Sequence, residues 1–151
     1  MGVRPLIHQH RYSLFNRGFE QTAQREVIAE GLGEIFFSPL AKGLLTDRYF
    51  GGVPEDSRAA SASPFLSRES AQGIYLDVAR KLNALARARG ETLAQMALAW
   101  VLKNPAATSV LIGASRPAQI LSDLEALGRP DFSAEERARM EEILRGVPAF
   151  R

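Results

Sequence analysis

Apolar residues along this chain form two kinds of pattern, short continuous runs and longer stretches with helical spacing. The runs predict buried β-strands, because strands inside a parallel sheet are covered on both faces. These runs span residues 5–9, 34–37 and 109–112. Helical spacing recurs over residues 20–30, 71–89, 92–104, 116–127 and 134–145. Because strands and helices alternate, the pattern predicts an α/β fold with a parallel sheet.

Polar residues mark where several of these helices begin. Thr92 is expected to cap the helix that follows it, and Ser133 with Glu136 has the spacing of a capping box. Ser115 is predicted to cap the helix at 116–127, with Pro117 in its first turn.

Residues 40–70 show neither a helical nor a strand pattern. Loops of this length in compact domains are usually lids or disordered segments. Because Arg48, Tyr49 and Arg58 lie in it, we interpret the segment as a lid over an anionic ligand.

Composition narrows the function classes. The chain has 151 residues, 46% hydrophobic and 24% charged, which is typical of one globular domain. It has no cysteine, which excludes disulfide scaffolds and thiol catalysis. No apolar run approaches the roughly 20 residues that span a bilayer, and the net charge is only +2 with scattered basic residues. We therefore expect no nucleic acid or membrane as a partner, and a cytoplasmic location.

Histidine and tyrosine residues offer little independent chemistry. His8 and His10 flank Gln9 and so share one face of a strand, but no third ligand is apparent, and no metal site is expected. Tyr12 and Tyr49 would need a nearby Lys or His to act as general acids, and the sequence places none there.

Two of the apolar runs lead directly into turns of small residues, at 38–43 and 113–115. Small residues at a strand end let backbone N–H groups approach an anion, so the turns predict a phosphate site. Neither turn contains an evident acid, base or nucleophile. Three strands would also leave apolar edges uncovered, which predicts self-association or a larger assembly.

Several ordered motifs together resemble the aldo-keto reductase superfamily. They are QHRYS at 9–13, FSPLAKGLLT at 37–46 and LIGAS at 111–115. DRY at 47–49 with PEDSRA at 54–59 is similar to the branch that holds bacterial glyceraldehyde 3-phosphate reductases and voltage-gated potassium channel β subunits.

The resemblance implies an incomplete (β/α)8 barrel, because a whole barrel takes about 250 residues. Residues 1–151 would form a single partial domain containing strands six to eight, their helices and the C-terminal helix. The family reduces aldehydes and ketones with NADPH. Its catalytic Asp, Tyr, Lys and His lie on the first four strands, which nothing here matches, so no catalytic residue is expected in this chain.

The same resemblance implies which residues hold NADP(H). Gln9 would bind the nicotinamide carboxamide, and Phe37 would stack on the nicotinamide ring. The pyrophosphate would lie against Ser38, Pro39, Leu40, Gly43 and Leu44. Arg48 and Arg58 would pair with phosphates.

The adenosine end of the cofactor is implied to lie on the last of these turns and on its helix. The 2′-phosphate would be bound by Gly113, Ser115, Arg116 and Gln119, which favours NADP over NAD. Asp123 would accept a hydrogen bond from adenine, while Ser122 is too short to replace the longer residue usual there.

Three functions stay open for the chain. It would be the NADP(H)-binding portion of a reductase, inactive alone, or a non-catalytic NADP(H)-binding or regulatory module resembling a channel β subunit, or an inert gene remnant. Its partners would be a missing N-terminal barrel half or further copies meeting at exposed strand edges. An aldehyde or ketone substrate is expected only in a complete barrel.

Overall fold

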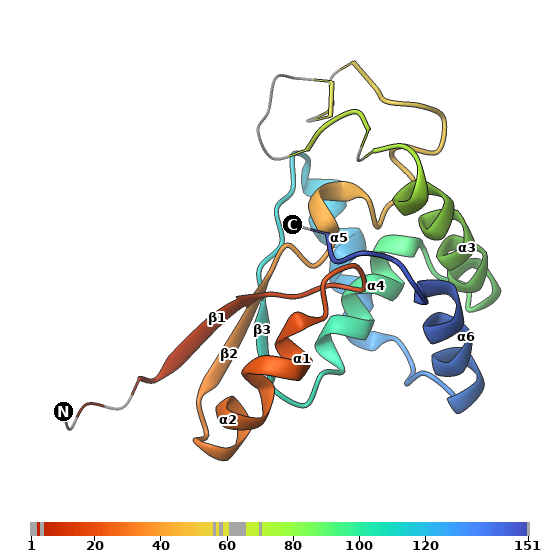
Figure 1. Ribbon diagram of the computed structural model, residues 1–151. Helices are drawn as coiled ribbons and strands as arrows, with labels where there is room; N and C mark the ends of the chain where they lie inside the picture. The colour runs from red at the N-terminus through yellow and green to blue at the C-terminus, as the bar shows by residue number, and fades with distance from the viewer. Residues whose placement is uncertain are drawn as a thin grey trace.

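A parallel β-sheet organises the molecule (Figure 1). The computed structural model describes residues 3, 5–55, 57, 59–60, 66–69 and 71–150. Within these, the sheet has three strands in the order β1-β2-β3, and both pairings are parallel. The strands are β1 (Ile7–Arg11), β2 (Gly33–Phe37) and β3 (Ala107–Val110). The predicted parallel α/β arrangement is confirmed, although β1 begins later and β3 earlier than the apolar runs indicate.

Two short helices connect β1 to β2, where the pattern predicts one. They are α1 (Gly18–Thr22) and α2 (Gln24–Ala29). Ala23 separates them because its φ of −104° and ψ of −16° depart from helical values. Gly31, at φ 63°, then reverses the chain toward β2 in the left-handed conformation that favours glycine.

Four further helices follow the long loop. They are α3 (Ile74–Ala88), α4 (Leu93–Leu102), α5 (Pro117–Leu124) and α6 (Ala134–Leu144). Short 3-10 turns lie at Ala41–Gly43 (η1) and Glu125–Gly128 (η2).

The helix starts agree with the predicted caps except at α5. Thr92 caps α4 as expected and also forms a capping box with Gln95, and Ser133 forms the expected capping box with Glu136. Arg116, not Ser115, occupies the N-cap position of α5, with φ −142° and ψ 142°. The prediction was wrong because Pro117 forces the residue before it into an extended conformation.

The helices cover one face of the sheet. Phe36 is fully buried there, with its ring centroid 4.5 Å from Tyr12 and 5.0 Å from Phe19 of α1. A larger core lies between α3, α4, α6 and the loop after β2, which contributes buried Leu45 and Tyr49. Tyr49 therefore anchors this loop in the core rather than facing a ligand.

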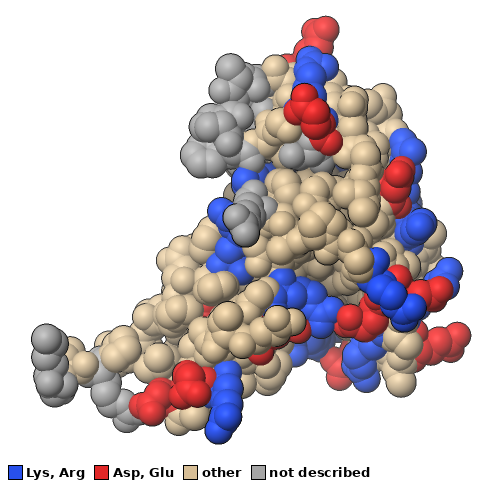
Figure 2. Space-filling view, in the orientation of Figure 1, with Lys and Arg blue, Asp and Glu red and all other residues tan. Residues whose placement is uncertain are grey.

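Among the described residues, no helix covers the other face of the sheet, which we call the open face. Strand alternation puts Ile7, Gln9 and Arg11 on this face, and Ile7 and Gln9 are exposed. Helix α5 also has exposed apolar side chains, among them Leu121 at 67% exposure. Figure 2 shows acidic and basic side chains together along the right of the molecule and at its lower left, with uncharged surface in its upper centre.

Candidate functional site

The carboxyl ends of the parallel strands meet at one edge of the sheet. Pairing continues past the strand ends, since Tyr12 N donates to Phe37 O at 3.2 Å and Leu111 N donates to Phe36 O at 2.8 Å. The turns that follow β2 and β3 therefore begin side by side, although they are far apart in the sequence.

The turn after β2 has an unusual backbone. Ser38, Ala41 and Lys42 have φ of 56°, 48° and 59°, a region that non-glycine residues rarely adopt. Ala41 N donates to Ser38 O at 3.0 Å, and Gly43 N donates to Leu40 O at 2.9 Å. Strained backbone of this kind persists only where the surrounding structure holds it in place, and it clusters at binding and active sites.

The predicted phosphate residues of this turn divide into two kinds. Ser38, Leu40 and Gly43 are half-buried, whereas Pro39 and Leu44 are buried. Leu44 packs in the larger core, so only its backbone is available to a ligand.

The predicted nicotinamide residues lie on the open face. Gln9 is exposed at the middle of β1, and Phe37 is half-buried at the end of β2. Arg11 is in register with Phe37, and its guanidinium lies 5.5 Å from the centroid of the Phe37 ring. The contact between Arg11 and Phe37 was not predicted from the sequence. The spacing of two residues between Gln9 and Arg11 nevertheless puts these two side chains on one face of the strand.

The predicted 2′-phosphate residues form the start of α5. Gln119 Oε1 accepts hydrogen bonds from Ser115 N at 2.8 Å, Ser115 Oγ at 3.1 Å and Arg116 N at 3.1 Å. These residues and Gly113 are all exposed. Gln119 thus holds the loop in shape and occupies donors that an anion would otherwise take.

The predicted adenine residues lie one turn further along α5. Asp123 is half-buried, and burial raises the pKa of its carboxyl. Ser122 faces α4 instead, because its carbonyl and Oγ both accept from Gln95 Nε2, at 3.1 and 3.3 Å.

The structure describes one of the two predicted lid cations, Arg48. Arg48 is exposed, and its backbone N donates to Thr46 Oγ1 at 3.2 Å. Arg58 lies outside the described residues.

Tyr12 is unsuited to proton transfer at neutral pH. Its hydroxyl donates to Glu20 Oε1 at 2.6 Å. Burial, and then the Glu20 hydrogen bond, raise the pKa of the phenol far above its usual value. The group therefore stays protonated and structural.

The histidines are also engaged in packing. His8 and His10 lie on one strand face, as predicted, with ring centroids 5.7 Å apart, and His8 Nδ1 lies 2.6 Å from buried Glu34 Oε2. In the part of the chain that the structure describes, no three His, Asp or Glu side chains cluster to hold a metal.

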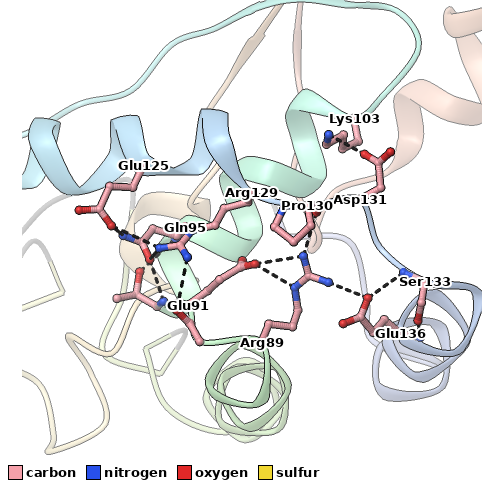
Figure 3. Close-up of polar contacts among 12 residues, drawn as sticks. Arg89, Glu91, Gln95, Lys103, Glu125, Arg129, Pro130, Asp131, Ser133 and Glu136 are labelled. Carbon is pink, nitrogen blue, oxygen red and sulfur yellow. Dashed lines mark hydrogen bonds and ion pairs between the residues drawn. The ribbon is translucent and has the colours of Figure 1, made fainter.

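Two clusters of polar side chains, not predicted from the sequence, connect helices (Figure 3). One joins α4 to α5 and η2, and the other joins the end of α3 to α6. Gln95 Nε2 donates to Glu125 Oε2 at 2.8 Å, and Arg129 donates to Gln95 Oε1 at 2.9 Å. Arg89 lies between Glu91 and Glu136, at 3.0 and 2.6 Å. The cluster around Gln95 holds α5, which carries the predicted adenosine residues, against α4, because Gln95 Nε2 also donates to Ser122 of α5.

Together, the fold and site describe an α/β protein with a candidate ligand site at the carboxyl edge of a parallel sheet. A sequence profile of the aldo/keto reductase family matches residues 1–145. The chain belongs to the aldo/keto reductase family.

Relatives agree with this assignment. The chain is 41% identical over 141 residues to L-glyceraldehyde 3-phosphate reductase of Escherichia coli O157:H7, covering 91% of this chain and 41% of the relative. It is 33% identical over 151 residues to a putative voltage-gated potassium channel subunit beta of Schizosaccharomyces pombe, covering 97% and 44%. The chain thus spans less than half the length of these relatives.

Solved structures confirm the fold. The glycerol dehydrogenase AKR11B4 from Gluconobacter oxydans superposes with a TM-score of 0.75 at 22% identity, over 93% of this chain and 42% of that chain. The aldo-keto reductase AKR11C1 from Bacillus halodurans gives 0.67 at 20% identity, over 95% and 44%. The predicted incomplete (β/α)8 barrel is confirmed. Among the described residues, no helix has the length and apolar character needed to cross a membrane.

Proposed function

We propose that this chain is the NADP(H)-binding side of an aldo-keto reductase barrel. The observation that carries the proposal is the convergence of residues 37–44 and 111–119 at one edge of the sheet. One segment brings a strained turn of small residues, and the other brings Arg116 at the start of a helix. Backbone donors, a cation and a helix start are what phosphate groups require.

Each part of the site has a separate task in this proposal. Gln9, exposed on the open face, would fix the nicotinamide carboxamide, and Phe37 would stack on the ring. Ser38 and its turn would hold the pyrophosphate, with Arg48 at the rim. Arg116 would pair with the 2′-phosphate, and Asp123 would accept from adenine. The bound cofactor would supply the hydride that reduces an aldehyde or ketone.

Carbonyl reduction also needs a proton donor, and Tyr12 of this chain would not be that donor. The donor would come from a polypeptide that completes the barrel beyond β1 and β3. The exposed apolar residues of the open face and of α5 fit such a partner, or further copies of this chain. We therefore propose that the chain binds NADP(H) alone but reduces a carbonyl only in a completed barrel.

A non-catalytic regulatory module remains the second candidate. It is favoured by the similarity to potassium channel subunits. The inert-remnant alternative differs from both because it requires no cofactor binding.

Titration with NADPH and NADH tests the proposal. We expect saturable binding of NADPH, seen by its fluorescence and by a rise in thermal midpoint. The variant Arg116→Leu should weaken NADPH binding about tenfold and leave NADH binding unchanged, because only NADPH carries the 2′-phosphate.

Arg25→Leu is the matched control, since Arg25 is an exposed arginine on α2, away from the carboxyl ends of the strands where the candidate site lies. It should bind both nucleotides like the parent chain. An absence of saturable NADPH binding by the folded chain would contradict the proposal and favour the inert remnant.

A further inference from the structure

The segment after α6, residues 146–150, returns across the molecule to the turn after β2 (Figure 1). It is attached to the loop after β1, since Phe150 N donates to Phe15 O at 2.8 Å and Asn16 Nδ2 donates to Phe150 O at 2.9 Å. It is also attached to α3, because the hydroxyl of Tyr75 donates to Pro148 O at 3.2 Å. Hydrogen bonds to two separate elements therefore fix the course of this segment.

The Phe150 side chain connects this segment to the turn. It is 7% exposed, and its ring centroid lies 5.2 Å from that of Tyr75, at an interplanar angle of 75°. Lys42 Nζ lies 5.0 Å from the Phe150 centroid, which is within range for a cation–π contact. One ring thus contacts both α3 and the turn after β2.

Lys42 lies in strained backbone, as does Ala41 beside it. Their φ values of 59° and 48° fall in the left-handed region, which non-glycine residues keep only where the surrounding structure holds them. Ala41 is 2% exposed and is held within the larger core. Lys42 is half-buried, and its side chain reaches the ring of Phe150. The segment after α6 therefore supports the strained part of the turn from outside it.

We propose that Phe150 is a positioning residue for the turn after β2, and that it keeps Lys42 and its neighbours in their strained conformation. The consequence for ligand binding rests on the proposed function, which puts the cofactor pyrophosphate against this turn. The support of the turn itself follows from the contacts of Phe150 alone. Without the ring, the turn would open while the rest of the core stays folded, and fewer molecules would have a turn able to bind phosphate.

Hydrogen exchange of the full chain, followed at single amides by nuclear magnetic resonance, tests this support. Gly43 N and Leu45 N both donate to Leu40 O, at 2.9 and 3.1 Å, and so report opening of the turn. Amides of α4 report unfolding of the whole core. In Phe150→Leu, we expect protection at the two turn amides to be largely lost, by about tenfold or more relative to α4. Lys42→Met removes the contact from its other side and should change exchange in the same direction.

Phe132→Leu is the matched control. Phe132 lies in the same core at 4% exposure, and its ring centroid is 4.3 Å from the guanidinium of Arg89 at the end of α3. This variant should change exchange in α4 and in the turn alike. If neither Phe150→Leu nor Lys42→Met opens the turn selectively, or if Phe132→Leu opens it equally, Phe150 does not position the turn.

NADPH binding separates this inference from the proposed function. In Phe150→Leu the Kd for NADPH, measured by its fluorescence, should rise about twofold or more, because only molecules with a closed turn bind. If the turn opens selectively but the parent chain does not bind NADPH, the proposed function is wrong and the positioning role holds. If the parent binds NADPH but the turn amides of the variant keep their protection, the positioning role is wrong and the proposed function holds. An opened turn with unchanged affinity would contradict the assignment of the pyrophosphate to this turn.

Discussion

Replacing Arg89 with methionine should lower the free energy of unfolding by about 3–5 kcal/mol. The guanidinium donates to Glu91 Oε1 at 3.0 Å, to Glu136 Oε2 at 2.6 Å and to Pro130 O at 3.0 Å. The side chains of Arg89 and Glu91 are only 5% and 0% exposed. Methionine keeps much of the stem but leaves the Glu91 carboxylate buried without its cation, which causes the loss.

Urea unfolding of the parent chain and of the variant measures this effect. Arg139→Met is the matched control, because Arg139 pairs with Glu142 on the surface, where the two side chains are 60% and 57% exposed. We expect the control to cost less than about 1 kcal/mol, since water screens an exposed pair. Equal losses in the two variants would show that burial of the Arg89–Glu91 pair adds nothing to its contribution to stability.

The second large effect is expected from Phe36→Ala, at about 3–5 kcal/mol. The Phe36 side chain is 0% exposed and packs against Tyr12 and Phe19, with centroids 4.5 and 5.0 Å away. Alanine would leave a cavity between β2 and α1 that the neighbouring rings cannot fill. The midpoint of urea unfolding should fall accordingly.

Phe37→Ala is the natural comparison, because Phe37 is the next residue and lies on the open face. We expect it to cost only about 1 kcal/mol in unfolding free energy. Under the proposed function it should instead weaken NADPH binding. If both variants destabilise the chain equally, the division of β2 into a covered and an open face is wrong.

Local signals predicted most of the fold. Apolar runs located the strands to within about two residues, because a buried strand is apolar on both faces. Thr92 and Ser133 predicted helix starts correctly, since capping depends on residues within one turn. The ordered motifs at 9–13, 37–46 and 111–115 together indicated the family, which the comparisons confirm.

Errors arose where a neighbour in space or along the chain overruled a local preference. Pro117 moved the cap of α5 to Arg116, and Ala23 interrupted what looked like one helix. Tyr49 seemed to belong to a lid over a ligand, but it is 2% exposed in the core. No local pattern distinguishes an aromatic that anchors a loop from one that faces a ligand.

The sequence by itself determined the strands and helices, the parallel sheet and the family, because each is encoded in periodicity or in contiguous motifs. Only the tertiary structure decided which cations have partners. Arg89 and Arg11 look alike in the sequence, yet one lies between two carboxylates and the other has a buried Nε without a partner. Pairing depends on residues far away in the chain that folding brings within a few ångströms, and no sequence spacing records that distance.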